Sequence, residues 1–218
     1  MPTWTLTALD LPLRYTWKIA RNASTVKTNF VVAVALAGHV GRGEAAPNVR
    51  YGETPALLQA QFGQLLAAGL PTAADLPALD ALLARVPVAQ ALRFALEAAL
   101  THALAARAGQ PVWAFLGVPA PAPAVPTAFS LPIMAPAAVA GFLATQNARR
   151  FGLLKIKVNA ADGLALLQAV AAAAPGHPLL VDGNETWASA AGVLAFLAAA
   201  AAVHLLGVGV RVGVLLGV

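Results

Sequence analysis

The second half of the chain alternates between short apolar runs and longer helical segments, and this feature constrains its fold most. The strand-like runs and the helical segments after them are 125–131 and 136–149, 153–158 and 161–174, and 178–182 and 188–202. Parallel strands need a crossover of this length, usually a helix, whereas antiparallel strands can be joined by tight turns. The pattern therefore predicts three βα units of a parallel sheet or barrel, fewer than half the units of a (β/α)8 barrel.

The first half has a different order of elements. We expect strands at 3–10 and 29–37, a glycine-rich turn from Gly38 to Gly43, and helices at 54–69, 75–85 and 88–108. The last helix is the clearest, because its apolar residues form one stripe: Leu92, Ala95, Leu96, Ala99, Leu100 and Leu104. Gly109 is placed to end it.

Proline alternates with small residues from Pro119 to Pro126, as it does in linkers. The predicted organisation is therefore a first domain at 1–118, three βα units at 119–206, and a tail at 207–218. The tail is a glycine- and valine-rich repeat without capping residues or amphipathic period, so we expect it not to continue the preceding domain.

Composition excludes several classes of protein. The chain is 59% hydrophobic and 11% charged, but alanine accounts for most of the excess and favours helix. The segment Ala188–Val210 has no charged residue and is long enough to span a bilayer, yet alanine and glycine dominate it, so we expect no membrane partner. The net charge is +5, but Arg149–Arg150 is the only adjacent basic pair and the sequence has no longer basic run. We therefore expect no nucleic-acid binding.

The chain has no cysteine, which excludes disulfides and thiolate chemistry. The segment Met1–Arg14 lacks the long apolar stretch of a signal peptide, so the expected location is cytoplasmic.

Two lysines and a carboxylate are the candidate chemical groups. Lys155 and Lys157 are two apart on one predicted strand, so they share a face. When two ammonium groups lie so close together, each disfavours the charged form of the other. One of them is therefore suited to act as a base. The next predicted strand ends in Asp182, a hard oxygen ligand suited to Mg²⁺. The pattern predicts proton abstraction beside a metal ion.

Two other interpretations stay open for these residues. The lysines could face solvent on an edge strand, where lysine is common. Asp182 could be an ordinary helix N-cap or turn residue. The apolar neighbours Leu154, Ile156 and Val158 favour a strand with one face in the core and both lysines on the other.

Four segments together resemble a known family. They are Gly41–Pro47 with Arg50–Thr54, the helix Ala91–Leu100, the Lys155-Ile156-Lys157 strand, and the Asp182-Gly183-Asn184 turn. In this order and at these distances they resemble the enolase superfamily, in its muconate-lactonizing and mandelate racemase-like branch, and within it the dipeptide epimerases of the L-Ala-D/L-Glu type. The resemblance implies an α+β capping domain followed by the first part of a (β/α)8 TIM-type barrel, here incomplete.

The resemblance also implies a reaction. Family members remove the proton α to a carboxylate, and Mg²⁺ holds the enolate. It implies that Lys157 is the base with Lys155 beside it, and that Asp182 is a metal ligand supported by Asn184.

The remaining roles come from the same resemblance. Ser130 matches a hydroxyl position near the family site, and Arg21 matches a capping-loop arginine that binds a substrate carboxylate. The implied substrate is a dipeptide such as L-Ala-L-Glu, and the chain is a possible homo-oligomer.

The chain departs from the family after about residue 206. In family members two further metal carboxylates and a second catalytic lysine lie on later barrel strands, whereas here the glycine- and valine-rich tail begins. We therefore expect a truncated or frameshifted chain, weak Mg²⁺ binding and little or no activity. Two alternatives stay open: o-succinylbenzoate synthase or cycloisomerase chemistry on the same scaffold, and a non-catalytic fragment.

Overall fold

The computed structural model describes residues 1–204, and the surroundings of side chains as far as residue 201. The predicted tail at 207–218 lies outside the described residues. The chain forms two compact units. The first consists of Met1–Pro12 and Val26–Pro123, and the second consists of Leu13–Thr25 and the chain from Ala124 onward.

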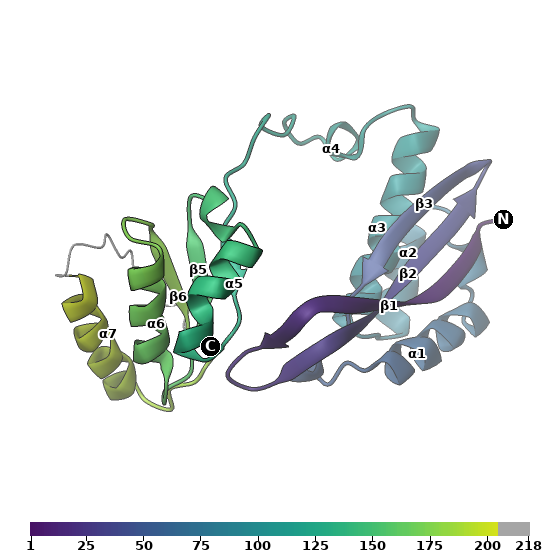
Figure 1. The fold of residues 1–218 in the computed structure, drawn as a ribbon. Helices are drawn as coiled ribbons and strands as arrows, with labels where there is room; N and C mark the ends of the chain where they lie inside the picture. The colour runs from purple at the N-terminus through teal and green to yellow at the C-terminus, as the bar shows by residue number, and fades with distance from the viewer. Residues whose placement is uncertain (205–218) are drawn as a thin grey trace. The chain divides into compact units, whose positions relative to one another are not determined.

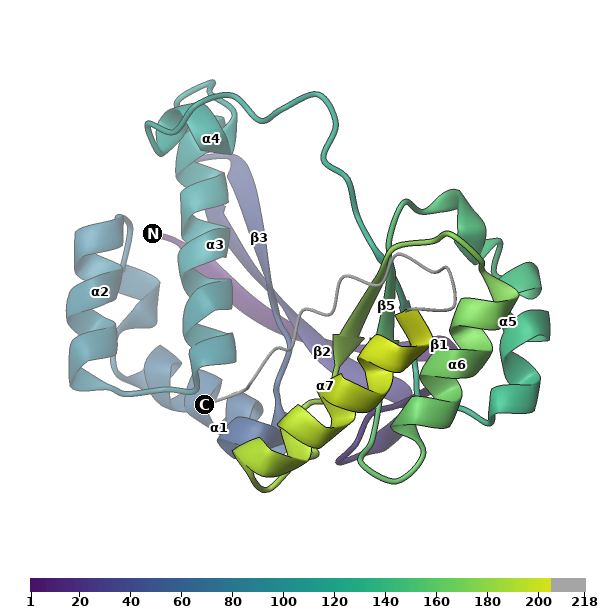
Figure 2. The same cartoon turned by 90° about the vertical axis from the view of Figure 1, so that its left-hand side faces the viewer.

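A three-stranded sheet with helices on one face forms the first unit (Figures 1 and 2), except that the connection between its first two strands and the adjoining strand ends, within Leu13–Thr25, belong to the second unit. The strands lie in the order β1 (Thr3–Lys18), β2 (Ala23–Leu36) and β3 (His39–Ala45). The helices are α1 (Pro55–Ala67), α2 (Leu76–Arg85), α3 (Gln90–Arg107) and the short α4 (Val112–Phe115), with 3₁₀ turns at Val49–Tyr51 and Leu70–Thr72. The predicted strands and three helices are confirmed, both strands being longer than expected, and α4 was not predicted.

The glycine-rich turn predicted from Gly38 to Gly43 is wrong over most of its length, because β3 begins at His39. Strand β3 pairs antiparallel with β2, and its buried residues are Gly41, Gly43 and Ala45. A Cβ on Gly41 would lie 1.9 Å from the carbonyl oxygen of Ala99 in α3. These glycines therefore let a helix lie directly on the strand, a role that sequence reasoning cannot distinguish from a turn.

The predicted apolar stripe of α3 is confirmed. Its residues are fully or almost fully buried in the core of the first unit: Leu92, Ala95, Leu96, Ala99, Leu100 and Leu104. The helix ends where predicted, since Gly109 follows with φ +66°, a left-handed conformation that suits glycine. Small residues on this stripe allow the close approach to β3.

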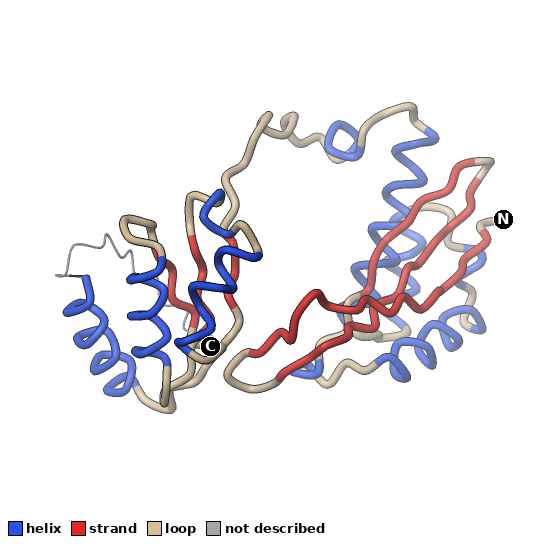
Figure 3. Tube along the Cα trace, viewed as in Figure 1, coloured by secondary structure: helices blue, strands red, loops and turns tan. Residues whose placement is uncertain are grey.

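A parallel three-stranded sheet forms the second unit, with helices along one face (Figure 3). The strands lie in the order β4 (Phe129–Leu131), β5 (Leu154–Lys157) and β6 (Leu179–Asp182). The helices are α5 (Val139–Thr145), α6 (Gly163–Ala173) and α7 (Ala190–His204), with 3₁₀ turns at Pro136–Ala138 and Ala148–Arg150. All three predicted βα units are confirmed. The first helix is shorter than predicted, because Asn147 adopts φ +48° and interrupts it.

The core of the second unit lies between this sheet and its helices. Leu154, Ile156 and Val158 are fully buried there, together with apolar residues of α5 and α6. Since side chains alternate along a strand, Lys155 and Lys157 point to the face of the sheet away from the helices. The apolar helix layer therefore determines which face carries the polar groups.

Helix α7 covers most of the uncharged segment Ala188–Val210. Within residues 1–204, no helix combines the length and the hydropathy that crossing a bilayer requires.

Candidate active site

The two lysines lie on the central strand of the parallel sheet. Strand β5 pairs with β4 on one side and β6 on the other, so the alternative of edge-strand lysines is wrong. Ser130 on β4 is the register partner of Lys155, and Asp182 on β6 is the register partner of Lys157. Residues in parallel register point to the same face, so all four side chains share the open face of the sheet near its carboxyl end.

Both lysines make ion pairs with Asp182. Nζ of Lys155 lies 2.8 Å from Oδ2 of Asp182, and Nζ of Lys157 lies 2.6 Å from the same oxygen. The exposed fractions of the side chains are 24% for Lys155, 12% for Lys157 and 4% for Asp182. The lysines therefore share a carboxylate instead of facing each other alone, an arrangement that their spacing on the strand did not predict.

The charge of Asp182 is stabilised by its neighbours. Burial would raise the pKa of Asp182, but hydrogen bonds from Lys155 and Lys157 and from the main-chain N–H of Asn184 outweigh it, and its pKa lies below the ordinary value. Asp182 is thus a carboxylate at neutral pH, the form that a cation or a protonated lysine binds.

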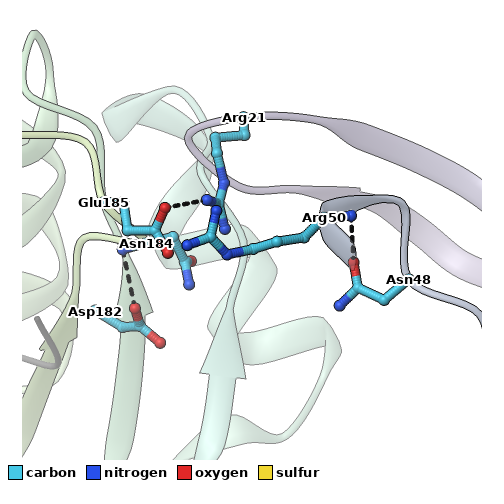
Figure 4. A network of polar contacts seen from close by, with 6 residues as sticks. All are labelled: Arg21, Asn48, Arg50, Asp182, Asn184 and Glu185. Atoms are coloured by element: carbon cyan, nitrogen blue, oxygen red, sulfur yellow. Dashed lines mark hydrogen bonds and ion pairs between the residues drawn. The ribbon is translucent and has the colours of Figure 1, made fainter. Parts of the chain in front are cut away.

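The loop after β6 holds Asp182 through its main chain (Figure 4). The N–H of Asn184 donates to Oδ1 of Asp182 at 3.1 Å, and Asn184 adopts φ +46°. Trp187 packs on Gly183, where a Cβ would lie 2.2 Å from the indole ring. Helix α7 begins only at Ala190, so the interpretation of Asp182 as a helix N-cap is wrong. The interpretation as a turn residue is confirmed by its hydrogen bond from Asn184, although Asp182 also contacts both lysines.

The oxygen atoms near Asp182 suit Mg²⁺ in type but not in number. Oδ1 of Asn184 is buried without a hydrogen-bond partner, and the carboxylate of Asp182 lies two residues away. Magnesium prefers six oxygen ligands in octahedral geometry. Within the part of the chain that the structure describes, no three His, Asp or Glu side chains cluster as metal ligands. These residues could contribute part of a magnesium site, with Asp182 as its carboxylate.

Arg21 forms an ion pair that the sequence did not reveal. It lies in the connection between β1 and β2, and its guanidinium pairs with the carboxylate of Glu185 on the loop after β6 (Figure 4). The two residues are 164 positions apart in the chain, and both belong to the second unit. Glu185 was missed because a charged residue in a turn has no distinguishing pattern; its position next to Asn184 was the available signal.

In the first unit, Glu53 has a structural role. Its buried carboxylate accepts hydrogen bonds from the main-chain N–H groups of Asn48, at 3.0 Å, and Ala91, at 3.1 Å, the latter in the first turn of α3. Asn48 in turn accepts a hydrogen bond from the N–H of Arg50 at 3.0 Å (Figure 4). A carboxylate at a helix N-terminus is stabilised by the free N–H groups there.

Comparison with known proteins places this arrangement in a family. No family model matches the chain. It is 33% identical over 189 residues to the L-Ala-D/L-amino acid epimerase of Pedosphaera parvula, which covers 82% of this chain and 52% of that protein. It is 33% identical over 185 residues to the hydrophobic dipeptide epimerase of Roseobacter litoralis, covering 81% of this chain and 52% of the relative. The chain thus spans about half the length of these curated relatives.

A solved structure agrees with this result. The chain matches an enolase family member from Agrobacterium tumefaciens, with homology to dipeptide epimerases, that was crystallised with bound sodium and L-Ala-L-Glu. The TM-score is 0.79 and the identity 28%, and the match covers 94% of this chain and 60% of that one. The architecture is thus an α+β capping domain followed by the first part of a (β/α)8 barrel. The chain belongs to the enolase superfamily and resembles the dipeptide epimerases within it.

Proposed function

We propose that this chain carries the first half of a dipeptide epimerase site, which removes the proton α to the carboxylate of a dipeptide. The observation that carries the proposal is the convergence of Lys155 and Lys157 on Asp182 at the carboxyl end of the parallel strands. Active sites of (β/α)8 barrels lie at this end. The curated relatives act on dipeptides or on L-Ala-D/L-amino acids, as their names state, which supports the same substrate class here.

Lys157 is the proposed base. It is the less exposed lysine and lies nearer the end of β5, with its Nζ on the open face of the sheet. A lysine accepts a proton only as the neutral amine, so its contact with Asp182 must give way when substrate binds. Lys155 lies two residues earlier on the same face of β5, beside the proposed base.

Asp182 is the proposed carboxylate ligand of Mg²⁺, with Asn184 holding its orientation through the main-chain hydrogen bond. A bound divalent cation would supply positive charge beside the enolate oxygen. Ser130 lies on β4, next to Lys155 of β5, and is a proposed polar contact to the substrate. Arg21, which pairs with Glu185 on the loop after β6, is the proposed contact to a carboxylate of the substrate.

Proton exchange into deuterated solvent tests the proposal. We expect the chain, with Mg²⁺, to exchange the α-proton of one stereoisomer of L-Ala-L-Glu, L-Ala-D-Glu or L-Ala-L-Leu, as NMR detects, without interconverting stereoisomers. Among the described residues, the lysines of the proposed site lie on one side of the substrate's α-carbon. None of them can therefore donate a proton from the other side. Lys157→Ala should abolish the exchange, whereas Lys27→Ala, which removes an exposed lysine of β2, should leave it unchanged.

Two results would contradict the proposal. Exchange that persists in Lys157→Ala would remove Lys157 from the reaction. No exchange with any dipeptide in the unaltered chain would favour the alternative of a non-catalytic module.

A further inference from the structure

We propose that Thr186 is a positioning residue of the candidate site: its hydroxyl ties the loop after β6 to the loop after β5 and so fixes the orientation of the Asp182 carboxylate. The inference rests on the proposed function, in which Asp182 and Lys157 take part. Its starting point is a hydrogen bond between the two loops. The main-chain N–H of Ala160, on the loop after β5, donates to Oγ1 of Thr186, on the loop after β6, at 2.9 Å.

The loop after β6 contains a tight turn. The N–H of Thr186 donates to the carbonyl oxygen of Gly183 at 3.0 Å, and the two residues between them, Asn184 and Glu185, have φ of +46° and +64°. Positive φ at both central positions is typical of a type I′ turn, which favours glycine, asparagine and aspartate. Asn184 suits this turn, but glutamate does not. The turn therefore needs contacts with its surroundings to keep this conformation.

The two residues at the end of the turn supply these contacts. Trp187 packs on Gly183, and its ring centroid lies 4.8 Å from that of Phe196 in α7. This apolar packing holds the turn against the helix layer. The hydroxyl of Thr186 holds the turn in a second direction, toward Ala160 and the end of β5.

The turn determines how the carboxylate of Asp182 is oriented. The N–H of Asn184 donates to Oδ1 of Asp182 at 3.1 Å (Figure 4). Lys155 and Lys157 both contact the other oxygen, Oδ2. If the turn moves away from β5, the hydrogen bond to Oδ1 is lost and the carboxylate can rotate. Thr186 thus acts on the site through Asn184 and Asp182, which makes it a positioning residue.

Amide hydrogen exchange, measured by NMR, tests this role. Thr186→Val keeps the shape of the side chain but removes the acceptor for the N–H of Ala160. We expect the N–H groups of Ala160 and Asn184 both to exchange about tenfold faster, the scale of one lost hydrogen bond. Thr186→Ser keeps a hydroxyl and should restore the slow exchange of both groups.

The N–H of Leu154, at the start of β5, is the reference for general unfolding. It donates to the carbonyl oxygen of Pro178 at 3.1 Å, and its exchange should be the same in all variants. If it accelerates as much as the N–H of Asn184 does, Thr186→Val loosens the whole sheet and the proposal is overturned. Faster exchange of Ala160 alone would overturn it as well, because the hydroxyl would then hold only its own donor.

Thr72→Val is the matched control in the first unit. Oγ1 of Thr72 donates to the carbonyl oxygen of Gly69 at 2.7 Å, so this variant also loses one hydrogen bond of a threonine hydroxyl. The exchange of the Asn184 N–H should not change in it. Equal acceleration of Asn184 in Thr72→Val and Thr186→Val would contradict a specific role of Thr186.

Proton exchange from a dipeptide gives a second readout. With L-Ala-L-Glu and Mg²⁺ in deuterated solvent, Thr186→Val should lower the saturating rate of α-proton exchange about tenfold and leave the apparent KM nearly unchanged. Thr186→Ser should restore the rate, and an unaltered rate in Thr186→Val would overturn the positioning role. If the unaltered chain exchanges no dipeptide proton, the proposed function fails, whereas the amide exchange of Asn184 still decides whether Thr186 holds the turn.

Discussion

Nζ of Lys157 lies 2.6 Å from Oδ2 of Asp182, across a register pair of two parallel strands. Nζ of Lys155, two residues earlier on β5, lies 2.8 Å from the same oxygen. A carboxylate shared by two ammonium groups is held firmly in place. The contact also explains why the lysine pair can lie on a central, mostly buried strand, because a buried charge without a partner is costly.

Removal of this carboxylate should destabilise the fold. Asp182→Asn leaves two largely buried lysines without a charged partner, and we expect the free energy of unfolding to fall by about 2–4 kcal/mol. Urea unfolding followed by circular dichroism measures the change. The control is Asp80→Asn, which breaks an exposed ion pair with Arg93 and should change stability by less than about 1 kcal/mol. Equal effects of the two substitutions would show that the shared carboxylate adds no stability.

The stabilisation by Asp182 should depend on pH. Its pKa in the folded chain is below the ordinary value, despite burial, because the lysines and the Asn184 N–H favour the charged form. A group with a lowered folded pKa stabilises the protein above its unfolded pKa of about 4, and this contribution is lost as pH falls through the folded value. The stability difference between the unaltered chain and Asp182→Asn should therefore shrink from about pH 5 downward. A stability difference between the two proteins that grows as the pH falls would contradict this prediction.

The close packing of α3 on β3 predicts opposite effects for two glycines. Gly41→Ala would place a Cβ 1.9 Å from the carbonyl oxygen of Ala99, so strand and helix must separate and stability should fall by about 1–3 kcal/mol. Gly63→Ala in α1 meets no atom within 4 Å and should raise stability by about 0.5–1 kcal/mol, since alanine favours helix. Thermal unfolding of both variants checks the prediction. A neutral Gly41→Ala would mean that the two elements are not in close contact.

Magnesium should stabilise the chain only slightly. Among the described residues, Asp182 is the carboxylate available to the metal, and both of its oxygens already accept hydrogen bonds. Stabilisation by a ligand grows with its concentration relative to its dissociation constant. We expect millimolar Mg²⁺ to raise the melting temperature by less than about 2 °C. A large rise that Asp182→Asn abolishes would reveal ligands beyond those described here.

Sequence periodicity was sufficient for the βα units, because the alternation of apolar residues is a local property. The same reasoning placed Lys155 and Lys157 on one face opposite Leu154 and Ile156, as the structure has them. It failed at β3, where Gly41 and Gly43 resembled a turn. Both positions need glycine because the backbone of α3 packs closely against them. Helix α3 lies far along the chain, and no local pattern indicates such a contact.

The sequence by itself determined the three βα units, the long helix α3, the shared face of the two lysines and the carboxylate at the end of β6. Only the tertiary structure decided which charges meet. The alignment of Lys157 with Asp182 depends on the register between β5 and β6, and the pairing of Arg21 with Glu185 joins residues 164 positions apart. Propensity and periodicity act over a few residues, whereas the partners of a charge are set by strand register and by the packing of distant segments.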